Sequence, residues 1–348
     1  MSKPVIVTGA AGFIGFHVAQ TLMQQHVPIL GIDNFNAYYD PSLKEARWSL
    51  LQKNPLFTAE RADLSDSLAV NALFEVNRPD YIIHLAGQPG VRQSIETPDL
   101  YIPSNITSFL NILEGCRHYP VQHLIYASSS SVYGLNTSVP FNESDPVQKP
   151  SSLYAATKIA DEAMAHAYSH LYQIPSSGLR FFTVYGPWGR PDMAVYTFTD
   201  AIANNRPITV ANAGRIWRDF TYIDDIVEGI LRLLHKPPFQ TELSSDEPDH
   251  GNEACRPPLL QTAPHRIYNI GNDHPEELNE LIRLIEEELG QKAVRKESGL
   301  PPGDIVETWA DVRLLRETVG FSPDTKLKEG VRRFVAWYRD FHMNRGQK

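Results

Sequence analysis

The fold of this chain is decided by the stretch Val5-Ile6-Val7-Thr8-Gly9-Ala10-Ala11-Gly12-Phe13-Ile14-Gly15. The β-branched run at its start is typical of a strand buried in a parallel sheet, and helical periodicity continues from residue 13 to residue 25. The first of the three glycines allows a tight turn, the second lets the backbone approach a pyrophosphate, and the third lets the helix lie close against the strand. The stretch therefore predicts a cradle for a dinucleotide, with these candidate cofactor contacts: Gly9, Gly12, Phe13, Ile14 and Gly15.

The second expected strand, residues 29–32, ends in an acidic residue, Asp33. Dinucleotide-binding folds place a carboxylate at about this distance after the glycine loop. Such a carboxylate accepts hydrogen bonds from the adenosine ribose and repels a 2′-phosphate, which favours NAD over NADP. The alternative interpretation is that Asp33 only opens a turn with Asn34. Both residues are candidate cofactor contacts.

Strand-like and helical segments continue to alternate along the chain. The expected strands are residues 56–60, 81–85, 124–126, 178–182 and 266–270, and the expected helices include residues 67–76, 100–117 and 276–289. Alternation of this kind predicts an α/β protein with a Rossmann-type doubly wound parallel sheet. Ligands bind beyond the carboxyl ends of such strands. Further candidate cofactor contacts follow the third and fourth strands: Asp63, Leu64, Leu85 and Ala86.

The composition excludes several classes of function. A formal net charge of −9 over 348 residues argues against a protein that binds nucleic acid or an anionic membrane, since both need a positive surface. The N-terminus lacks the layout of a signal peptide and no apolar run reaches membrane-spanning length, so we expect a cytoplasmic protein. The two cysteines, Cys116 and Cys255, have no metal-ligand spacing, and no metal is expected.

A tyrosine and a lysine four residues apart, Tyr154 and Lys158, lie in a segment that is expected to be helical. Spacing of four places both side chains on one helical face. A free tyrosine has a pKa near ~10 and is a poor base at neutral pH. An ammonium ~4 Å away favours a neighbouring anion by about 4 kcal/mol at an effective dielectric of ~20. The pair is therefore suited to proton abstraction, unless the two residues meet by chance on an exposed helix.

Two further stretches suit the binding of a polar, anionic substrate. Four consecutive serines, residues 128–131, follow the fifth strand at the expected ligand-binding edge, so at least one hydroxyl is expected to face the substrate. Residues 183–192 are rich in proline and glycine and are interpreted as a loop. The segment from residue 180 to residue 218 holds five arginines against two acids within an acidic chain.

Residues 237–265 are interpreted as a flexible proline-rich surface insertion.

The glycine loop, the serine run and the Tyr154–Lys158 pair together resemble the extended short-chain dehydrogenase/reductase superfamily over nearly the whole chain. More narrowly, FFTVYGPWGRPDMA at residues 181–194 and RDFTYIDD at residues 218–225 look like the UDP-glucuronate 4-epimerases of that superfamily. The resemblance implies tightly bound NAD and a UDP-sugar substrate. It implies that Ser129, Tyr154 and Lys158 are catalytic and that Asn105 contacts NAD. The substrate contacts that it implies are Arg92, Ser130, Ser131, Thr183, Arg190 and Arg218.

The implied reaction converts UDP-glucuronate into UDP-galacturonate through a 4-keto sugar. Tyr154 takes the proton of the 4-hydroxyl, Ser129 assists with a hydrogen bond, and the hydride of carbon 4 passes to NAD⁺. UDP-glucose 4-epimerases share the scaffold, and related galactose epimerases carry an arginine where this chain has Pro301, three positions before Asp304. The missing arginine places more of the diphosphate contact on Arg218.

Three other functions remain as alternatives. UDP-glucuronate decarboxylases typically carry a glutamate where this chain has Ser131, and 4,6-dehydratases typically carry an Asp-Glu pair at Ser130 and Ser131. An NAD-binding regulatory protein without activity is the alternative outside the enzymes, and the complete Ser129, Tyr154 and Lys158 set argues against it.

The resemblance also implies a division into two domains and a pairing of subunits. We expect an NAD-binding domain over residues 1–182, joined by parts of residues 222–270. A smaller substrate-binding domain is expected to consist of residues 183–221 and 271–348. Relatives commonly pair through the Tyr154 helix and the helix near Leu100, so a homodimer is expected.

Overall fold

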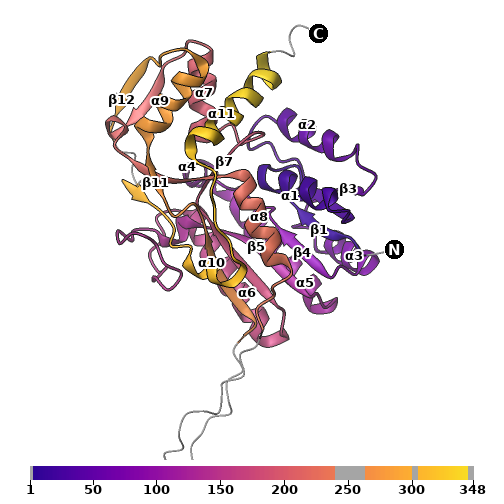
Figure 1. The fold of residues 1–348 in the computed structure, drawn as a ribbon. Helices are drawn as coiled ribbons and strands as arrows, with labels where there is room; N and C mark the ends of the chain where they lie inside the picture. The colour runs from indigo at the N-terminus through magenta and orange to yellow at the C-terminus, as the bar shows by residue number, and fades with distance from the viewer. Residues whose placement is uncertain (1–2, 240–262, 300–304, 344–348) are drawn as a thin grey trace, which may run out of the picture.

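The computed structural model describes residues 3–239, 263–299 and 305–343 (Figure 1). Its centre is a parallel sheet of seven strands in the order β10-β6-β5-β4-β1-β2-β3. The strands are β1 Val5–Thr8, β2 Ile29–Asp33, β3 Phe57–Arg61, β4 Tyr81–His84, β5 His123–Ser129, β6 Ser176–Phe181 and β10 His265–Ile270. Strand order reverses between β1 and β4, which is the position where doubly wound sheets bind dinucleotides. The predicted fold class is confirmed.

Helices cover both faces of this sheet because the side chains of its strands alternate between two apolar layers. One layer contains Val5 and Val7 with the helices α1 Phe13–Gln24 and α8 Ile223–Leu234. The other layer contains Ile6 with α3 Ser67–Asn77, α5 Ser108–His118 and α6 Leu153–Tyr172. Asp66 caps α3 and Ser152 caps α6, where its hydroxyl accepts a hydrogen bond from Ala155 N at 3.1 Å.

The remaining elements form a smaller layer beyond the carboxyl ends of the main strands, at the top of Figure 1. Its strands are β7 Thr183–Tyr185, β8 Ile208–Ala211, β9 Trp217–Tyr222, β11 Pro275–Glu277, β12 Arg295–Ser298 and β13 Glu307–Thr308. Its helices are α7 Ala194–Ala203, α9 Leu278–Leu289 and α11 Leu327–Tyr338, while α10 Arg313–Val319 packs near α8. Strand β9 pairs with β7, β11 and β13, and β8 pairs with β12.

Two expected segments differ in detail from the structure. The helix expected over residues 100–117 forms as one continuous helical stretch, but a 3₁₀ turn at Pro98–Leu100 precedes it, and its first part, Ile102–Thr107, is a wide π-helical turn that runs directly into α5. Proline lacks a backbone N–H to donate, and Pro103 lies at the start of the wide turn. Residues 183–192 were expected to be a loop throughout, yet Thr183–Tyr185 forms β7 because it finds a parallel partner in β9. Residues 240–262 of the expected insertion lie outside the described residues.

A buried carboxylate, that of Asp219 on β9, helps to join the smaller layer to the main sheet. Its oxygens accept hydrogen bonds from Thr221 Oγ1 (2.8 Å) and from the backbone N–H groups of Asn272 (2.6 Å), Asp273 (3.2 Å) and Ala310 (3.1 Å). These donors come from three separate segments of the chain. Asp219 therefore holds β9, the segment after β10 and the segment after β13 in one arrangement.

We expect Asp219→Asn to lower the free energy of unfolding by about 1–3 kcal/mol, because the amide NH₂ would face a buried N–H donor. Urea unfolding measures this change. Asp224→Asn is the matched control: Asp224 pairs with Arg333 at 3.3 Å at the surface, where an ion pair contributes at most about 1 kcal/mol. Equal stability losses for the two variants would contradict the role given to Asp219.

Candidate active site

A cavity of about 950 Å³ lies beyond the carboxyl ends of the central strands. Its wall is made by the glycine loop after β1 and by the segments that follow β2, β3, β4 and β5. The first turn of α6 and residues 181–193 complete it. Sequence segments far apart in the chain thus meet at the switch point of the sheet, where the fold is expected to bind ligands.

The glycine loop has the geometry that only glycine permits. Gly9 has a φ of +68°, and a Cβ at this residue would lie 2.8 Å from Ala86 N. A Cβ at Gly15 would lie 2.2 Å from Gly9 O, so α1 could not approach the loop. All five predicted contacts of the loop line the cavity, and Gly12, Phe13 and Ile14 do so at the N-terminus of α1. Backbone N–H groups at a helix N-terminus suit a diphosphate.

The position of Asp33 is consistent with both interpretations of its role, as a contact of the adenosine ribose and as the residue that opens a turn. Its carboxylate accepts hydrogen bonds from Ala11 N at 3.1 Å and from Phe35 N at 2.8 Å, so it holds the glycine loop and also opens the turn. It lines the cavity as well, together with Asn34, and Lys44 Nζ lies 3.9 Å from its Oδ1. Lys44, on α2 Ser42–Leu51, escaped the sequence analysis because its approach to Asp33 depends on the path of the loop between them.

The other predicted cofactor contacts fall into two groups. Asp63, Leu64, Leu85 and Ala86 line the cavity as expected from their places after β3 and β4. Asn105 is buried and is not among the lining residues. Its Oδ1 accepts from Gln88 N at 2.7 Å, and its Nδ2 donates to Gln88 O at 3.1 Å and to Thr157 Oγ1 at 2.9 Å. Asn105 thus joins the loop after β4 to α6, directly behind the cavity wall.

The three predicted catalytic residues meet in the cavity wall. Ser129 ends β5, Tyr154 lies in the first turn of α6, and Lys158 follows one turn later. Lys158 is buried, and its ammonium donates hydrogen bonds to Ala127 O at 3.0 Å and to Asp161 Oδ2 at 2.9 Å. The hydroxyl of Ser129 accepts a hydrogen bond from Ser131 N at 3.2 Å. Spacing of four on one helix therefore produces the arrangement that the sequence predicts.

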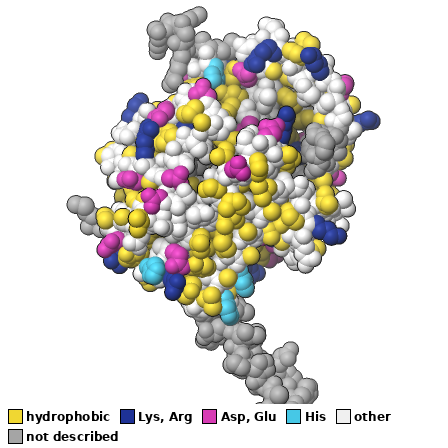
Figure 2. Space-filling model, turned by 180° about the vertical axis from the view of Figure 1, so that it is seen from behind, with side chains coloured by type: hydrophobic (Ala, Val, Ile, Leu, Met, Phe, Trp, Pro, Cys, Tyr) yellow, Lys and Arg dark blue, Asp and Glu magenta, His cyan; other side chains and the backbone are white. Residues whose placement is uncertain are grey.

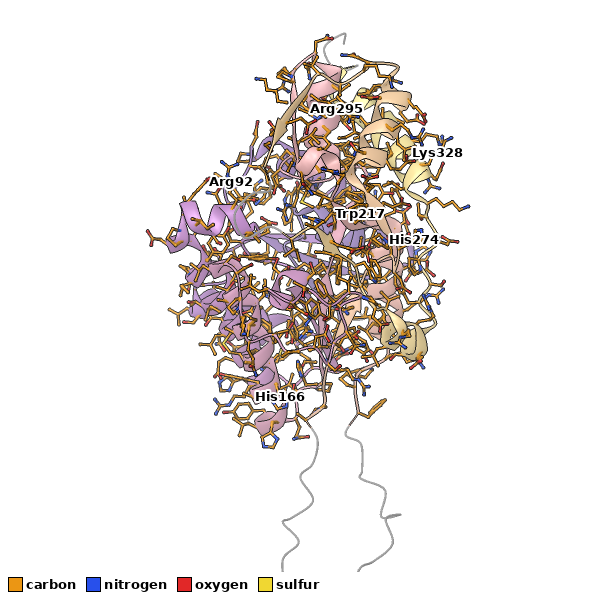
Figure 3. The ribbon with its side chains drawn as sticks, turned by 90° about the vertical axis from the view of Figure 1, so that its left-hand side faces the viewer. Arg92, His166, Trp217, His274, Arg295 and Lys328 are labelled. Atoms are coloured by element: carbon orange, nitrogen blue, oxygen red, sulfur yellow. The ribbon has the colours of Figure 1, made fainter. Side chains whose placement is uncertain are left out.

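The predicted substrate contacts are only partly brought together. Five of the predicted contacts line the cavity: Arg92, Ser130, Ser131, Thr183 and Arg190. Arg92 lies on α4 Val91–Glu96, at the outer edge of the molecule in Figure 3, and its side chain is 92% exposed and paired with Glu96 at 2.9 Å. Arg218 is not among the lining residues, and its guanidinium donates to the carbonyl oxygens of Trp217 and Val306. Pro301 and Asp304 lie outside the described residues.

Arg190 is held in place by two residues of the same wall. Its guanidinium donates to both carboxylate oxygens of Asp192, at 3.0 and 2.5 Å, and lies 5.6 Å from the ring centre of Tyr38. The Tyr38 hydroxyl donates to Asp192 Oδ2 at 3.0 Å. Burial acts to raise the pKa of Asp192, but the neighbouring guanidinium outweighs it and the net pKa lies below its usual value. Arg190 therefore faces the cavity as one member of an ionised pair.

Comparison with known proteins identifies the family. Residues 5–242 match the NAD dependent epimerase/dehydratase family. The chain belongs to this family. UDP-glucuronate 4-epimerase 4 from Arabidopsis thaliana is 44% identical, and the match covers 97% of this chain and 76% of the relative. Protein CapI from Staphylococcus aureus is 49% identical, and the match covers 97% of this chain and 99% of the relative. The crystal structure of UDP-glucuronic acid 4-epimerase from Bacillus cereus, in complex with UDP-glucuronic acid and NAD, matches with a TM-score of 0.84 at 29% identity, covering 97% of this chain and 100% of that one.

The cavity of this NAD-dependent epimerase/dehydratase fits its cofactor. Side chains at the glycine loop would fill the space next to the first turn of α1, and the Asp33 carboxylate stands at the end of β2, where the adenosine ribose lies in dinucleotide-binding folds.

Among the described residues no group of histidine, cysteine and acidic side chains could hold a metal ion. No helix in the described part of the chain has both the length and the apolar character needed to span a membrane.

A buried acid beside Lys158, the predicted catalytic lysine, was missed by the sequence analysis. Asp161 lies three residues after Lys158, and its Oδ1 has no hydrogen-bond partner among the described residues. Burial acts to lower the pKa of Lys158, but the surrounding groups, first among them the Asp161 carboxylate, together outweigh it and the net pKa lies above its usual value. Burial raises the pKa of Asp161 to about 6, although Lys158 acts in the opposite direction. An acid three residues after the lysine on the same helix was the available signal.

Proposed function

We propose that this protein interconverts UDP-glucuronate and UDP-galacturonate by epimerisation at carbon 4, with NAD as the bound cofactor. The observation that carries the proposal is the meeting of two sets of residues in one cavity. Ser129, Tyr154 and Lys158 supply acid–base chemistry, while Ser130, Ser131, Thr183 and Arg190 supply hydroxyls and a cation. The identity of 44% to a UDP-glucuronate 4-epimerase over 97% of the chain supports the same substrate.

Each catalytic side chain has a separate task in this reaction. Tyr154 removes the proton of the 4-hydroxyl and later returns a proton to the 4-keto oxygen. Lys158 stabilises the tyrosinate by its charge, and Ser129 donates a hydrogen bond to the reacting oxygen. The chemistry that NAD supplies when bound is uptake of the hydride of carbon 4 and its return to the same carbon. The glycine loop and Asp33 hold the cofactor, so the oxidised form is regenerated in place.

The substrate carboxylate needs protection at the keto stage. Oxidation of carbon 4 produces a β-keto acid, which tends to lose carbon dioxide. Hydrogen bonds and a cation that fix the carboxylate oppose this loss. Ser130, Ser131 and Thr183 supply the hydroxyls, and Arg190 supplies the charge-assisted contact, which it shares with Asp192. Ser131 occupies the position at which decarboxylases are expected to carry a glutamate, which favours the epimerase.

We also propose that the protein is a cytoplasmic homodimer with no nucleic acid or membrane partner. Figure 2 shows a broad band of hydrophobic side chains on the face seen from behind. Large apolar residues are exposed on and before α5 and near the end of α6: Leu100, Ile102, Leu110, Leu171 and Tyr172. Pairing two copies through α5 and α6 would remove this surface from water.

The proposal is tested by product analysis after incubation with UDP-glucuronate. UDP-galacturonate without net NADH is the expected product. UDP-pentose with carbon dioxide would indicate a decarboxylase, and conversion of UDP-glucose alone would indicate a neutral-sugar epimerase. Bound NAD with no turnover of any UDP-sugar would indicate a regulatory protein.

A pH profile tests the influence of Asp161 on the catalytic pair. Above pH 6 the ionised Asp161 opposes the effect of the Lys158 ammonium on the tyrosine, and Asp161→Asn removes this charge while an amide oxygen can still accept the lysine hydrogen bond. The ascending limb of kcat/KM is therefore expected at lower pH in the variant. The expected shift is on the order of one pH unit, which corresponds to about 1.4 kcal/mol of charge–charge interaction. A profile that loses height without moving along the pH axis would contradict this influence.

A further inference from the structure

A fully buried arginine, Arg47 on α2, has only neutral partners among the described residues. Its Nη1 donates to Ala11 O at 2.9 Å and to the Tyr39 hydroxyl at 2.7 Å. On its other side, Nε and Nη2 donate to Trp188 O at 3.1 and 2.6 Å, and Nη2 reaches Gly189 O at 3.4 Å. A buried guanidinium is costly unless its donors are satisfied. The planar fork of arginine satisfies them by bridging two loops at once.

The two loops that Arg47 bridges belong to different parts of the cavity. Ala11 lies in the glycine loop, directly before Gly12 in the cofactor cradle. Trp188 and Gly189 directly precede Arg190. The guanidinium thus connects the backbone that holds the cofactor to the backbone that carries Arg190.

A second side chain of the cofactor side holds the same loop. His17 on α1 has its Nε2 2.9 Å from Pro187 O, and burial lowers the pKa of His17 to about 4, so the neutral ring donates this hydrogen bond. Three consecutive carbonyl oxygens, those of residues 187–189, are therefore bound by side chains of α1 and α2. Trp188 has a φ of +63°, a conformation that a non-glycine residue keeps only when its surroundings impose it. Its ring packs against Phe16 of α1.

We infer that Arg47 is a positioning residue for the substrate carboxylate. By fixing the loop of residues 187–189 against the glycine loop, it sets the place of Arg190 relative to the cofactor, and so determines how the carboxylate is held at the keto stage. The inference rests on the proposed function. It goes beyond that function because Arg47 is not one of the residues that line the cavity: its guanidinium binds the wall from behind, and its effect on the product passes through Arg190.

Arg47→Lys tests the inference, because lysine keeps the charge but lacks the fork that reaches both loops. The measurements are kcat and KM for UDP-glucuronate, the ratio of UDP-pentose to UDP-galacturonate, and the thermal midpoint. We expect a tenfold or larger loss of kcat/KM for UDP-glucuronate, a smaller loss for any activity on UDP-glucose, and a higher share of UDP-pentose. Arg61→Lys is the matched control. Arg61, on β3, pairs at 2.6 Å with Glu45 of α2, the helix that carries Arg47, but it reaches neither of the two loops. It is expected to leave both rates and products unchanged.

A double variant separates positioning from general destabilisation. If Arg47 acts through Arg190, Arg47→Lys should add little to the losses caused by Arg190→Ala, so the two effects are not additive. His17→Ala removes the contact to the carbonyl oxygen of Pro187 and should raise the share of UDP-pentose by a smaller amount. This variant provides the test if Arg47→Lys does not fold. Equal losses on both sugars, an unchanged product ratio and additive effects would overturn the inference. Absence of UDP-galacturonate with the unaltered protein would instead overturn the proposed function.

Discussion

Tyr154→Phe is expected to lower the turnover of UDP-glucuronate at least ~10²-fold, and up to ~10⁴-fold, because it removes the general acid–base group. The aromatic ring remains, and with it the edge-on contact to Tyr101, whose ring centre lies 6.3 Å away. The variant should therefore fold and retain NAD. Steady-state kinetics measure the loss, and release of cofactor on denaturation measures the retained NAD.

The matched control is Tyr172→Phe at the far end of the same helix, where the residue is partly exposed and distant from the cavity. Its activity should equal that of the unaltered protein. Near-normal turnover by Tyr154→Phe would show that another group removes the proton.

Arg190→Ala is expected to reduce kcat/KM for UDP-glucuronate by about ten- to a hundredfold, the usual cost of losing a hydrogen bond to a charged group, ~1.5–3 kcal/mol. Activity on UDP-glucose should fall much less because that sugar carries no carboxylate. Some UDP-pentose should appear among the products, since the keto acid is held less firmly. Kinetics on both sugars and chromatography of the products provide the measurement.

Arg206→Ala is the control for Arg190, because Arg206 forms an exposed pair with Asp200 outside the cavity. The alternative is that Arg190 only braces its loop through Asp192. Equal losses on the acidic and the neutral sugar, with an unchanged product, would favour that alternative.

The fold could be predicted from the sequence because its decisive signals are local. The strand, glycines and helix of residues 5–24 lie within one stretch, and the structure forms them at the expected positions. Tyr154 and Lys158 share a helical turn, so their common face followed from spacing alone. The helix expected at residues 100–117 forms, but helical periodicity did not predict that its first part, Ile102–Thr107, would be π-helical.

Two of the residues that were missed act across long distances in the chain. Tyr38 reaches Asp192 over 154 positions, and Arg47 reaches Trp188 over 141. No periodicity or motif connects such pairs. The resemblance implied that Arg218 contacts the substrate. In the structure β13 lies beside β9, and the Arg218 guanidinium donates hydrogen bonds to the backbone carbonyls of Trp217 and Val306. Its role as a substrate contact stays a prediction.

In the proposed reaction, one hydrogen leaves carbon 4 and returns to it on the opposite face. UDP-glucuronate labelled with deuterium at carbon 4 tests this most directly, with the product followed by NMR in ordinary water. We predict UDP-galacturonate that keeps the deuterium at carbon 4, because the cofactor retains the hydride within the closed cycle. Loss of the deuterium to solvent, or UDP-pentose as the main product, would contradict epimerisation by this route.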